Sequence, residues 1–545
     1  MAACTKGVEP NIRPCTAAAD TVTLAVNEYA SLDPTTADSG CTLFPSTTVG
    51  AEYLIVPQLT AGNPGDRAGF RLFGDTILPV PSASAPASRA LAEPSSAERF
   101  HTFLRLGDER RSWGFAPRTE ATPMRSVSAE PPAFNQVRTF QVCAELDCSR
   151  FDRVGARVKA LRTKIAIYVD TLAPPGGLDS TALDALAAVF DQRLYSIDTA
   201  AFGVESDIDS NTVVMVLMTN TVNKLVPAAE CQSGFIAGFF FGVDLDPRFR
   251  NDSRSNKGEV FYTIVADPAA TLSCAHSGAE VQAFVPVTLI HEFQHMISFN
   301  QHVLERGSPN GELLWLNEGL SHYAEELGGR SYELDPSARR ADCTVGTTPC
   351  RFYGGNFLNA YDYLDTTSKH FLLPTEGIGT LTERGAAWLF VRYLVDHYAT
   401  GTTTASWDTL TRSLVQTSRS GAANIEFVTG AKFDSVVSRW ALANWVTDAP
   451  AAPPELKYES WNLHAVFSSL HTQRSGDFPK FYPLEPTVSA GRAVNLSGTL
   501  RSGSPIYHLA TQAPGDPGFT LSFTAPNGGL INTAFKPRLN VIRLQ

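Results

Sequence analysis

Alternation between apolar and polar positions marks both ends of the chain. Runs such as Val22-Thr-Leu-Ala-Val26 and Glu52-Tyr-Leu-Ile-Val56 are separated by Gly, Pro, Asp and Ser, and Phe519-Thr-Leu-Ser-Phe523 repeats the pattern near the C-terminus. A period of two is typical of strands that bury one face. We therefore predict an N-terminal all-β domain of sandwich type at residues 1–85 and a C-terminal all-β domain at residues 456–545.

The middle of the chain mixes two periods. Apolar runs of strand length lie at Lys164–Val169, Val213–Met218 and Lys257–Val265, and apolar residues recur at helical spacing from Ser180 to Tyr195. Helical patterns then continue to Trp445. A strand, a helix and further strands followed by long helices indicate an α+β domain, which we place at residues 156–455. The predicted protein is therefore multidomain, with an α+β domain flanked by two all-β domains.

Residues 86–155 show no clear period. The stretch Pro81–Ala90, which overlaps their start, is rich in Pro, Ser and Ala, and is predicted to be a linker. From Phe100 to Phe151, charges and prolines are mixed with scattered aromatic residues. This pattern leaves two interpretations open, a prosegment and an irregular extension.

Composition narrows the classes of partner. Of the 545 residues, 43% are hydrophobic and 18% are charged, a balance typical of globular proteins. A net charge of −11, without a Lys/Arg cluster, disfavours nucleic acids and anionic membranes as partners. The sequence contains no apolar run long enough to span a bilayer. We expect a monomer without a membrane span.

The nine cysteines indicate an oxidising compartment. Cys143 and Cys148 are close in sequence, as are Cys343 and Cys350, and each spacing fits a short disulfide loop. Cys231 and Cys274 form a third candidate pair, which leaves one thiol over among Cys4, Cys15 and Cys41. Free buried cysteines are the alternative. Met1–Cys4 does not resemble a signal peptide, so the leader of an exported protein would precede residue 1.

The strongest chemical motif is His291-Glu292-Phe-Gln-His295, within a mostly apolar pattern that predicts a helix from Pro286 to Phe299. Two histidines four residues apart lie on one face of a helix and can bind a single ion. Glu292 then lies beside that ion without being a ligand. The alternative is a pair of histidines that only belong to the helix core.

A third ligand is available downstream. The segment Leu314-Trp-Leu-Asn-Glu318-Gly follows a turn-rich stretch, Gly307-Ser-Pro-Asn-Gly311, which allows a second helix to fold back on the first. Catalytic Zn²⁺ takes three protein ligands, and two histidines with one glutamate are a usual set. The sequence therefore predicts Zn²⁺ bound by His291, His295 and Glu318, with Glu292 as the general base.

The pairing of HEFQH with WLNEGLSHYAE resembles the gluzincin zinc peptidases, and is most similar to the hyicolysin family of secreted bacterial metallopeptidases. The resemblance covers Val285–Leu327, with weaker support from Glu383–Leu394. It implies a gluzincin-like catalytic domain, zinc histidines at 291 and 295, the catalytic glutamate at 292 and the zinc glutamate at 318. In the thermolysin pattern an Asp steadies a ligand histidine, but His322 stands at that position, so we expect Glu325 or Asn317 to replace it.

The resemblance also implies a side chain that donates to the oxyanion, a Tyr, His or Arg located after the zinc glutamate. Thr382 stands where the aminopeptidase pattern carries this tyrosine. We expect Tyr393 to take the role, ahead of Arg384 and then His322.

These residues predict a secreted zinc endopeptidase that acts on proteins or peptides. Two alternatives stay open, a zinc aminopeptidase and a secreted binding or adhesion protein. The aminopeptidase signature GxMEN is absent from the sequence. The strand at Lys257–Val265 is the expected exposed edge for an extended substrate. Asp207-Ile-Asp209-Ser-Asn211 begins like a calcium loop but lacks its Gly and its final Glu, so we interpret it as a turn.

Overall fold

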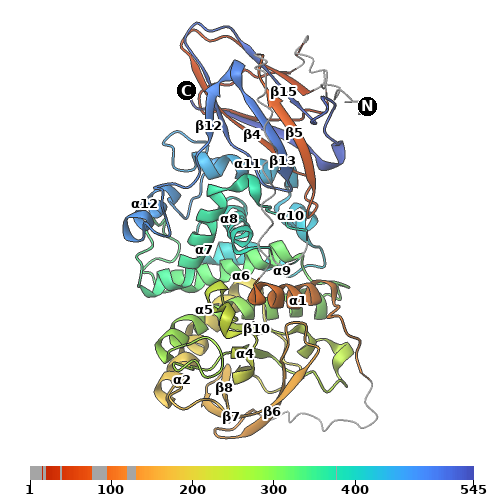
Figure 1. Ribbon diagram of the computed structural model, residues 1–545, viewed down its shortest axis with the longest axis vertical. Coiled ribbons are helices and arrows are strands. Elements are labelled where there is room, and N and C mark those ends of the chain that lie inside the picture. The colour runs from red at the N-terminus through yellow and green to blue at the C-terminus, as the bar shows by residue number, and fades with distance from the viewer. Residues whose placement is uncertain are drawn as a thin grey trace, which may run out of the picture.

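The computed structural model describes residues 15, 20–36, 40–75, 95–118, 131–375, 377 and 379–545. Along its long axis lie a β-sandwich, a layer of helices and a six-stranded sheet (Figure 1). The chain is therefore multidomain and mixes helices with sheets, as an α+β protein does. The predicted linker at Pro81–Ala90 lies outside the described residues.

The sandwich consists of two five-stranded sheets. One sheet has the strand order β1 (Asp20–Thr21), β3 (Cys41–Phe44), β15 (Phe519–Thr524), β5 (Arg67–Phe73) and β13 (Asn495–Arg501). The other has the order β12 (Thr487–Ala490), β14 (His508–Gln512), β4 (Ala51–Leu59), β16 (Pro537–Arg543) and β2 (Tyr29–Leu32). Val22–Val26, predicted as a strand, continues from β1 without strand pairing.

The prediction of two separate terminal β-domains is wrong, because strands from both ends of the chain alternate within each sheet. β15 pairs with β3 on one side and β5 on the other, and β4 lies between β14 and β16. Neither terminal segment alone could satisfy its backbone hydrogen bonds. The alternation of apolar residues predicts strands but carries no information on which strands become neighbours.

The six-stranded sheet has the order β10 (Gly238–Phe240), β11 (Val260–Thr263), β9 (Val214–Met218), β8 (Ile165–Asp170), β7 (Phe151–Leu161) and β6 (Val137–Cys143). β11 was expected to be the exposed edge, and this expectation is wrong. β10 pairs antiparallel with β11 on the side away from β9, and so becomes the edge strand itself. A three-residue strand between loops gives almost no periodic signal.

The described parts of residues 86–155, namely 95–118 and 131–155, are more ordered than expected. They form helix α1 (Ser96–Arg110), strand β6 and the start of β7. Ser95 caps α1 and forms a reciprocal capping box with Glu98, a helix-start signal present in the sequence. Phe100 and Leu104 are fully buried, which anchors the helix to the rest of the protein.

Helix α5 (Gly278–Phe299) carries the HExxH segment and starts earlier than predicted. Ser277 and Glu280 form its capping box, and Pro286 lies inside the helix instead of in its first turn. Proline lacks the N–H that an interior helical position would donate, so its presence suggested a start. The capping box nevertheless fixes the N-terminus at Ser277.

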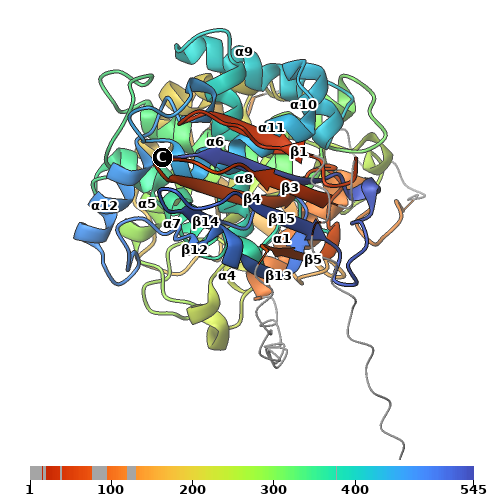
Figure 2. The same cartoon turned by 90° about the horizontal axis from the view of Figure 1, so that it is seen from above.

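The helical layer lies between the two β units (Figure 1). Its helices are α6 (Leu314–Arg330), α7 (Thr348–Asp365), α8 (Leu381–Tyr398), α9 (Thr404–Val415), α10 (Gly421–Thr429), α11 (Phe433–Val446) and α12 (Leu463–Gln473). Viewed from above, the sandwich strands lie over these helices (Figure 2), and α11 contacts β4 and β16. On the other side, α2 (Ser180–Val189) and α4 (Asn220–Asn223) contact the six-stranded sheet, whereas α3 (Tyr195–Phe202) contacts α5 and α9. Among the described residues, no helix is both long and apolar enough to cross a membrane.

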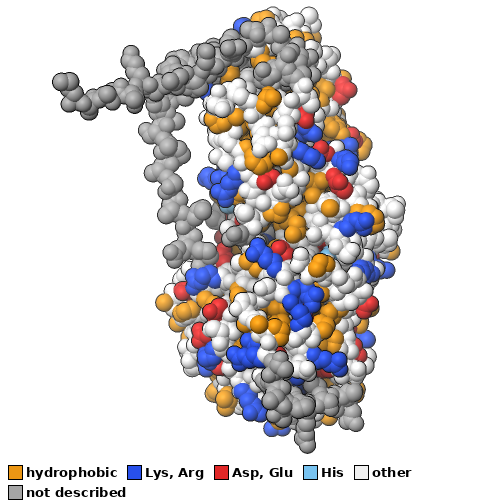
Figure 3. All heavy atoms as spheres, turned by 90° about the vertical axis from the view of Figure 1, so that its right-hand side faces the viewer, with side chains coloured by type: hydrophobic (Ala, Val, Ile, Leu, Met, Phe, Trp, Pro, Cys, Tyr) orange, Lys and Arg blue, Asp and Glu red, His pale blue; other side chains and the backbone are white. Residues whose placement is uncertain are grey.

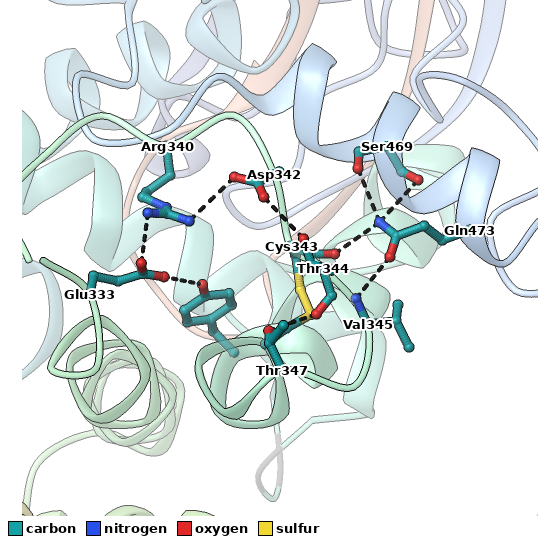
Figure 4. The surroundings of a disulfide bond; sticks show 11 residues. Glu333, Arg340, Asp342, Cys343, Thr344, Val345, Thr347, Ser469 and Gln473 are labelled. Carbon is teal, nitrogen blue, oxygen red and sulfur yellow. Dashed lines mark hydrogen bonds and ion pairs between the residues drawn. A yellow bond between two sulfur atoms is a disulfide. The ribbon is translucent and has the colours of Figure 1, made fainter.

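The disulfide predictions are confirmed for three pairs: Cys143–Cys148, Cys231–Cys274 and Cys343–Cys350. A fourth bridge joins Cys15 to Cys41, which leaves Cys4, outside the described residues, as the odd cysteine. The Cys343–Cys350 loop is held against α12, because Gln473 donates to the Cys343 carbonyl and accepts from the Val345 N–H (Figure 4).

Charge is unevenly distributed over the surface. On the face drawn in Figure 3, Lys and Arg side chains gather over the lower part of the molecule, where the six-stranded sheet lies. The net charge of −11 therefore does not describe every face. The expectation that nucleic acids are not partners stays a prediction.

Candidate active site

Helices α5 and α6 bring three predicted ligands to one point. The Nε2 atoms of His291 and His295 are 3.2 Å apart. Glu318 Oε2 lies 3.7 Å from His291 Nε2, and Glu318 Oε1 lies 3.4 Å from His295 Nε2. A tetrahedral zinc ion with bonds of about 2.0–2.1 Å separates its ligand atoms by about 3.3 Å. Each pair of these side chains therefore approaches the spacing of zinc ligands, with Glu318 facing His291 through one carboxylate oxygen and His295 through the other.

The chemistry of this set also fits zinc. Two imidazoles and one carboxylate are a usual ligand set of catalytic zinc. All three side chains are buried, and Glu318 Oε2 has no hydrogen-bond partner among the described residues. A buried carboxylate oxygen without a donor is costly unless a cation compensates it.

Gly319 allows α6 to pack closely against α8. A Cβ atom at this position would lie 2.9 Å from the Ala387 carbonyl oxygen and 2.9 Å from Val391 Cγ2, both on α8. Only glycine permits this close approach of α6 to α8 without a shift of the backbone. The glycine directly after Glu318 thus allows α6 to carry its carboxylate to the histidines.

Glu325 orients the first histidine. Its Oε1 lies 2.7 Å from His291 Nδ1, so that Nδ1 donates to the carboxylate and Nε2 faces the ligand cluster. Burial opposes ionisation of Glu325, but the charge of His322 and the hydrogen bond with His291 hold the pKa of Glu325 at about 2. Of the two expected partners, Glu325 makes this contact, whereas no hydrogen-bond partner is found for Asn317 Oδ1 within the described chain.

Glu292 lies beside the ligand cluster, and one of its oxygens is near enough to His291 and His295 that these three side chains could also hold a metal ion. Its Oε2 accepts a hydrogen bond of 2.9 Å from the Phe240 N–H on β10 and lies 3.6 Å from Arg105 Nη2. Burial alone would raise the pKa of Glu292, but Arg105 and the two histidines lower it below its ordinary value. The side chain is therefore held as a carboxylate, the form that accepts a proton.

Neither Arg105 nor its helix α1 was predicted from the sequence. Arg105 is buried, donates to the Phe240 carbonyl and pairs with Asp108 at 3.1 Å. His101, one turn earlier, is close enough to Glu292 and Glu318 for their charges to act on it, although burial dominates and lowers its pKa to about 4. The capping box at Ser95 could have revealed the helix, but nothing in the sequence links it to Glu292.

The two expected oxyanion donors have different positions. Arg384 Nη1 lies 3.8 Å from Glu318 Oε2, and the Arg384 Nε has no hydrogen-bond partner among the described residues. The Tyr393 hydroxyl instead donates to the Glu455 carbonyl at 2.8 Å, and this tyrosine is buried among the charges of Arg439 and the rings of Tyr398 and Tyr29. The structure brings Arg384 to the cluster and does not bring Tyr393 there. His322 lies against the His291 ring, with 4.9 Å between the ring centroids.

Comparisons with known proteins give one relative, a metalloprotease. No protein-family model matches the chain. The chain is similar to the neutral metalloprotease ShpI of Staphylococcus hyicus, with 28% identity over 211 residues, which is 39% of this chain and 44% of that protein. The match thus spans less than half the length of that relative. This similarity supports a relationship between the chain and the metalloproteases.

Proposed function

We propose that this protein is a secreted zinc-dependent endopeptidase of gluzincin type, related to the hyicolysin family. The observation that carries the proposal is the convergence of His291, His295 and Glu318 at zinc-ligand spacing, with the Glu292 carboxylate beside them. A zinc ion bound there would supply the positive charge that polarises a peptide carbonyl and acidifies water. The disulfides are consistent with an oxidising, extracellular location.

Glu292 is the proposed general base. Because Oε2 already accepts from the Phe240 N–H, we assign the proton transfer to Oε1. Oε1 takes the proton of the attacking water and later delivers it to the leaving amine, so that no covalent enzyme intermediate is needed. Arg105 keeps the carboxylate ionised until the proton arrives.

Arg384 is the proposed oxyanion donor. Of the two donors ranked first, Arg384 is the one that lies against a proposed zinc ligand, 3.8 Å from Glu318 Oε2. A guanidinium has five N–H groups, so it can contact Glu318 and still donate to a developing oxyanion. Tyr393 is not retained in this role, because its hydroxyl is engaged by Glu455.

The test is digestion of a mixed protein substrate, with and without a zinc chelator, followed by mass spectrometry of the released peptides. An endopeptidase yields internal fragments that disappear with the chelator and return with added zinc. Stepwise loss of single N-terminal residues would instead identify an aminopeptidase. A protein that binds zinc and releases nothing would support the binding or adhesion alternative.

A further inference from the structure

A second cluster of carboxylates lies away from the proposed zinc site. Ligand oxygens of Asp207, Asp209 and Glu259 lie within 4.8 Å of one another. With Glu205, the side chains of Asp207 and Glu259 line a hollow of about 210 Å³. The hollow is located where β9 and β11 begin, at Val214 and Val260.

The positive charge near this cluster does not balance the four carboxylates. Arg138 Nη1 lies 3.4 Å from Asp209 Oδ2, and Lys164 lines the hollow. Counting only Arg138 and Lys164 among the described cations, the four carboxylates leave an excess of two negative charges when all these groups are ionised. A single divalent cation would neutralise that excess.

Glu259 provides the second, independent observation. Its side chain is 1% exposed, and Oε1 accepts from the Ser206 hydroxyl at 2.6 Å and from the Ile208 N–H at 3.1 Å. Its other oxygen, Oε2, is buried without any hydrogen-bond partner in the described part of the chain. The great majority of buried polar atoms in proteins have a partner, and the described residues offer this oxygen neither an N–H nor an O–H, so a bound cation is a suitable partner.

We propose that Asp207, Asp209 and Glu259, with Glu205 beside them, bind a calcium ion. All the available donors are oxygens, which suit Ca²⁺ and not the nitrogen- and sulfur-preferring transition metals. The exposed side of Asp207 leaves room for the water ligands with which Ca²⁺ completes six to eight positions. Bound calcium would fasten the loop before β9 to the start of β11.

The sequence predicts only a turn here, because the loop lacks the Gly and the final Glu of an EF-hand. Asp207 and Asp209 come from that loop, but Glu259 joins them from a separate strand entry about fifty residues downstream. A calcium site assembled from two distant segments has no linear motif.

Calcium binding to the full-length, zinc-loaded protein tests the proposal. Equilibrium dialysis with radioactive calcium should find one equivalent bound, and millimolar Ca²⁺ should raise the unfolding temperature. Glu259→Gln and Asp207→Asn should each lose at least tenfold in calcium affinity while zinc content stays unchanged. The control is Asp184→Asn, which removes an exposed carboxylate that pairs with Arg162 outside this cluster.

The calcium-dependent change in unfolding temperature is compared within each variant, so a variant that is less stable at the outset remains informative. Asp207 is exposed, so its replacement should fold even where Glu259→Gln does not. Absence of binding by the unaltered protein at millimolar Ca²⁺ would overturn the proposal, as would calcium affinity unchanged by Asp207→Asn.

Discussion

The carboxylate of Glu325 lies 2.7 Å from His291 Nδ1 and thereby sets which nitrogen of that ring faces the other two ligands. His322, which occupies the position of the aspartate in the thermolysin pattern, lies 3.1 Å from the same oxygen of Glu325. The orienting carboxylate has thus moved by one helical turn along α6, and His322 stands next to it.

Glu325→Gln should therefore weaken zinc binding without abolishing it. Loss of a carboxylate that orients a ligand histidine typically lowers metal affinity about 10- to 100-fold. Glu318→Ala should have a larger effect, because it removes a ligand. Competition with a chromophoric chelator gives both affinities, and a larger loss for Glu325→Gln than for Glu318→Ala would mean that the third ligand is misassigned.

Glu292→Gln should abolish hydrolysis and leave zinc near one equivalent. The amide is nearly isosteric with the carboxylate but cannot accept the water proton, and Glu292 is not among the three proposed ligands. Metal analysis together with digestion of a protein substrate checks both halves. A folded Glu292→Gln protein that lacks zinc would contradict the assigned role.

Arg384→Met and Tyr393→Phe should have very different effects on kcat. Arg384 lies beside Glu318, so its loss should lower kcat about 100- to 1000-fold, the effect of removing one oxyanion donor, with little change in KM or zinc content. The Tyr393 hydroxyl bonds to Glu455, so Tyr393→Phe should leave kcat within a few-fold of the unaltered protein. If Arg384→Met costs less than tenfold, His322 is the next residue to replace.

The Cys343–Cys350 bridge should stabilise the protein modestly. A bridge between residues seven positions apart restricts the conformations of the unfolded chain, and this raises the free energy of the unfolded state by about 2 to 3 kcal/mol. Replacement of both cysteines by serine should lower the unfolding temperature by several degrees, and the contacts of Gln473 with this loop should hold it near its present place. Peptide mapping without reduction checks the bridge itself, and alkylation of both cysteines under those conditions would refute it.

His508 should make the sandwich sensitive to acid. Burial lowers the pKa of His508 to about 4, whereas an unfolded histidine titrates near 6.5. The unfolded state binds more protons between these values, so the stability contribution is complete above pH 6.5 and is lost as the pH falls toward 4. Neutral His508 bridges Thr487 and Ser489 of β12. Urea unfolding at pH 7.5 and at pH 5 gives the free energy of unfolding at each pH. Between these pH values, His508→Gln should lose less of that free energy than the unaltered protein, and an equal loss in both would contradict this role.

Individual helices and strands were predictable wherever apolar residues recur at the spacing of one buried face. The strands near Ile165 and Val214 and the helices that carry His291 and Glu318 lie where their periods place them. His291 and His295 are one helical turn apart, so the sequence alone predicts that their side chains lie on the same face of the helix. The three disulfide pairs that were expected are likewise close in sequence or flank one segment.

Relations between distant segments were decided only by the tertiary structure. Strand partners in the sandwich come from opposite ends of the chain, and an alternating pattern is the same whichever neighbour a strand takes. Arg105 contacts Glu292, Glu325 contacts His291, and Glu259 lies near Asp207, although the two members of each pair are far apart in the sequence. Such contacts depend on how whole helices and strands pack together. The sequence by itself determined which groups can do chemistry here, and the packing of helices and sheets determined which of them meet.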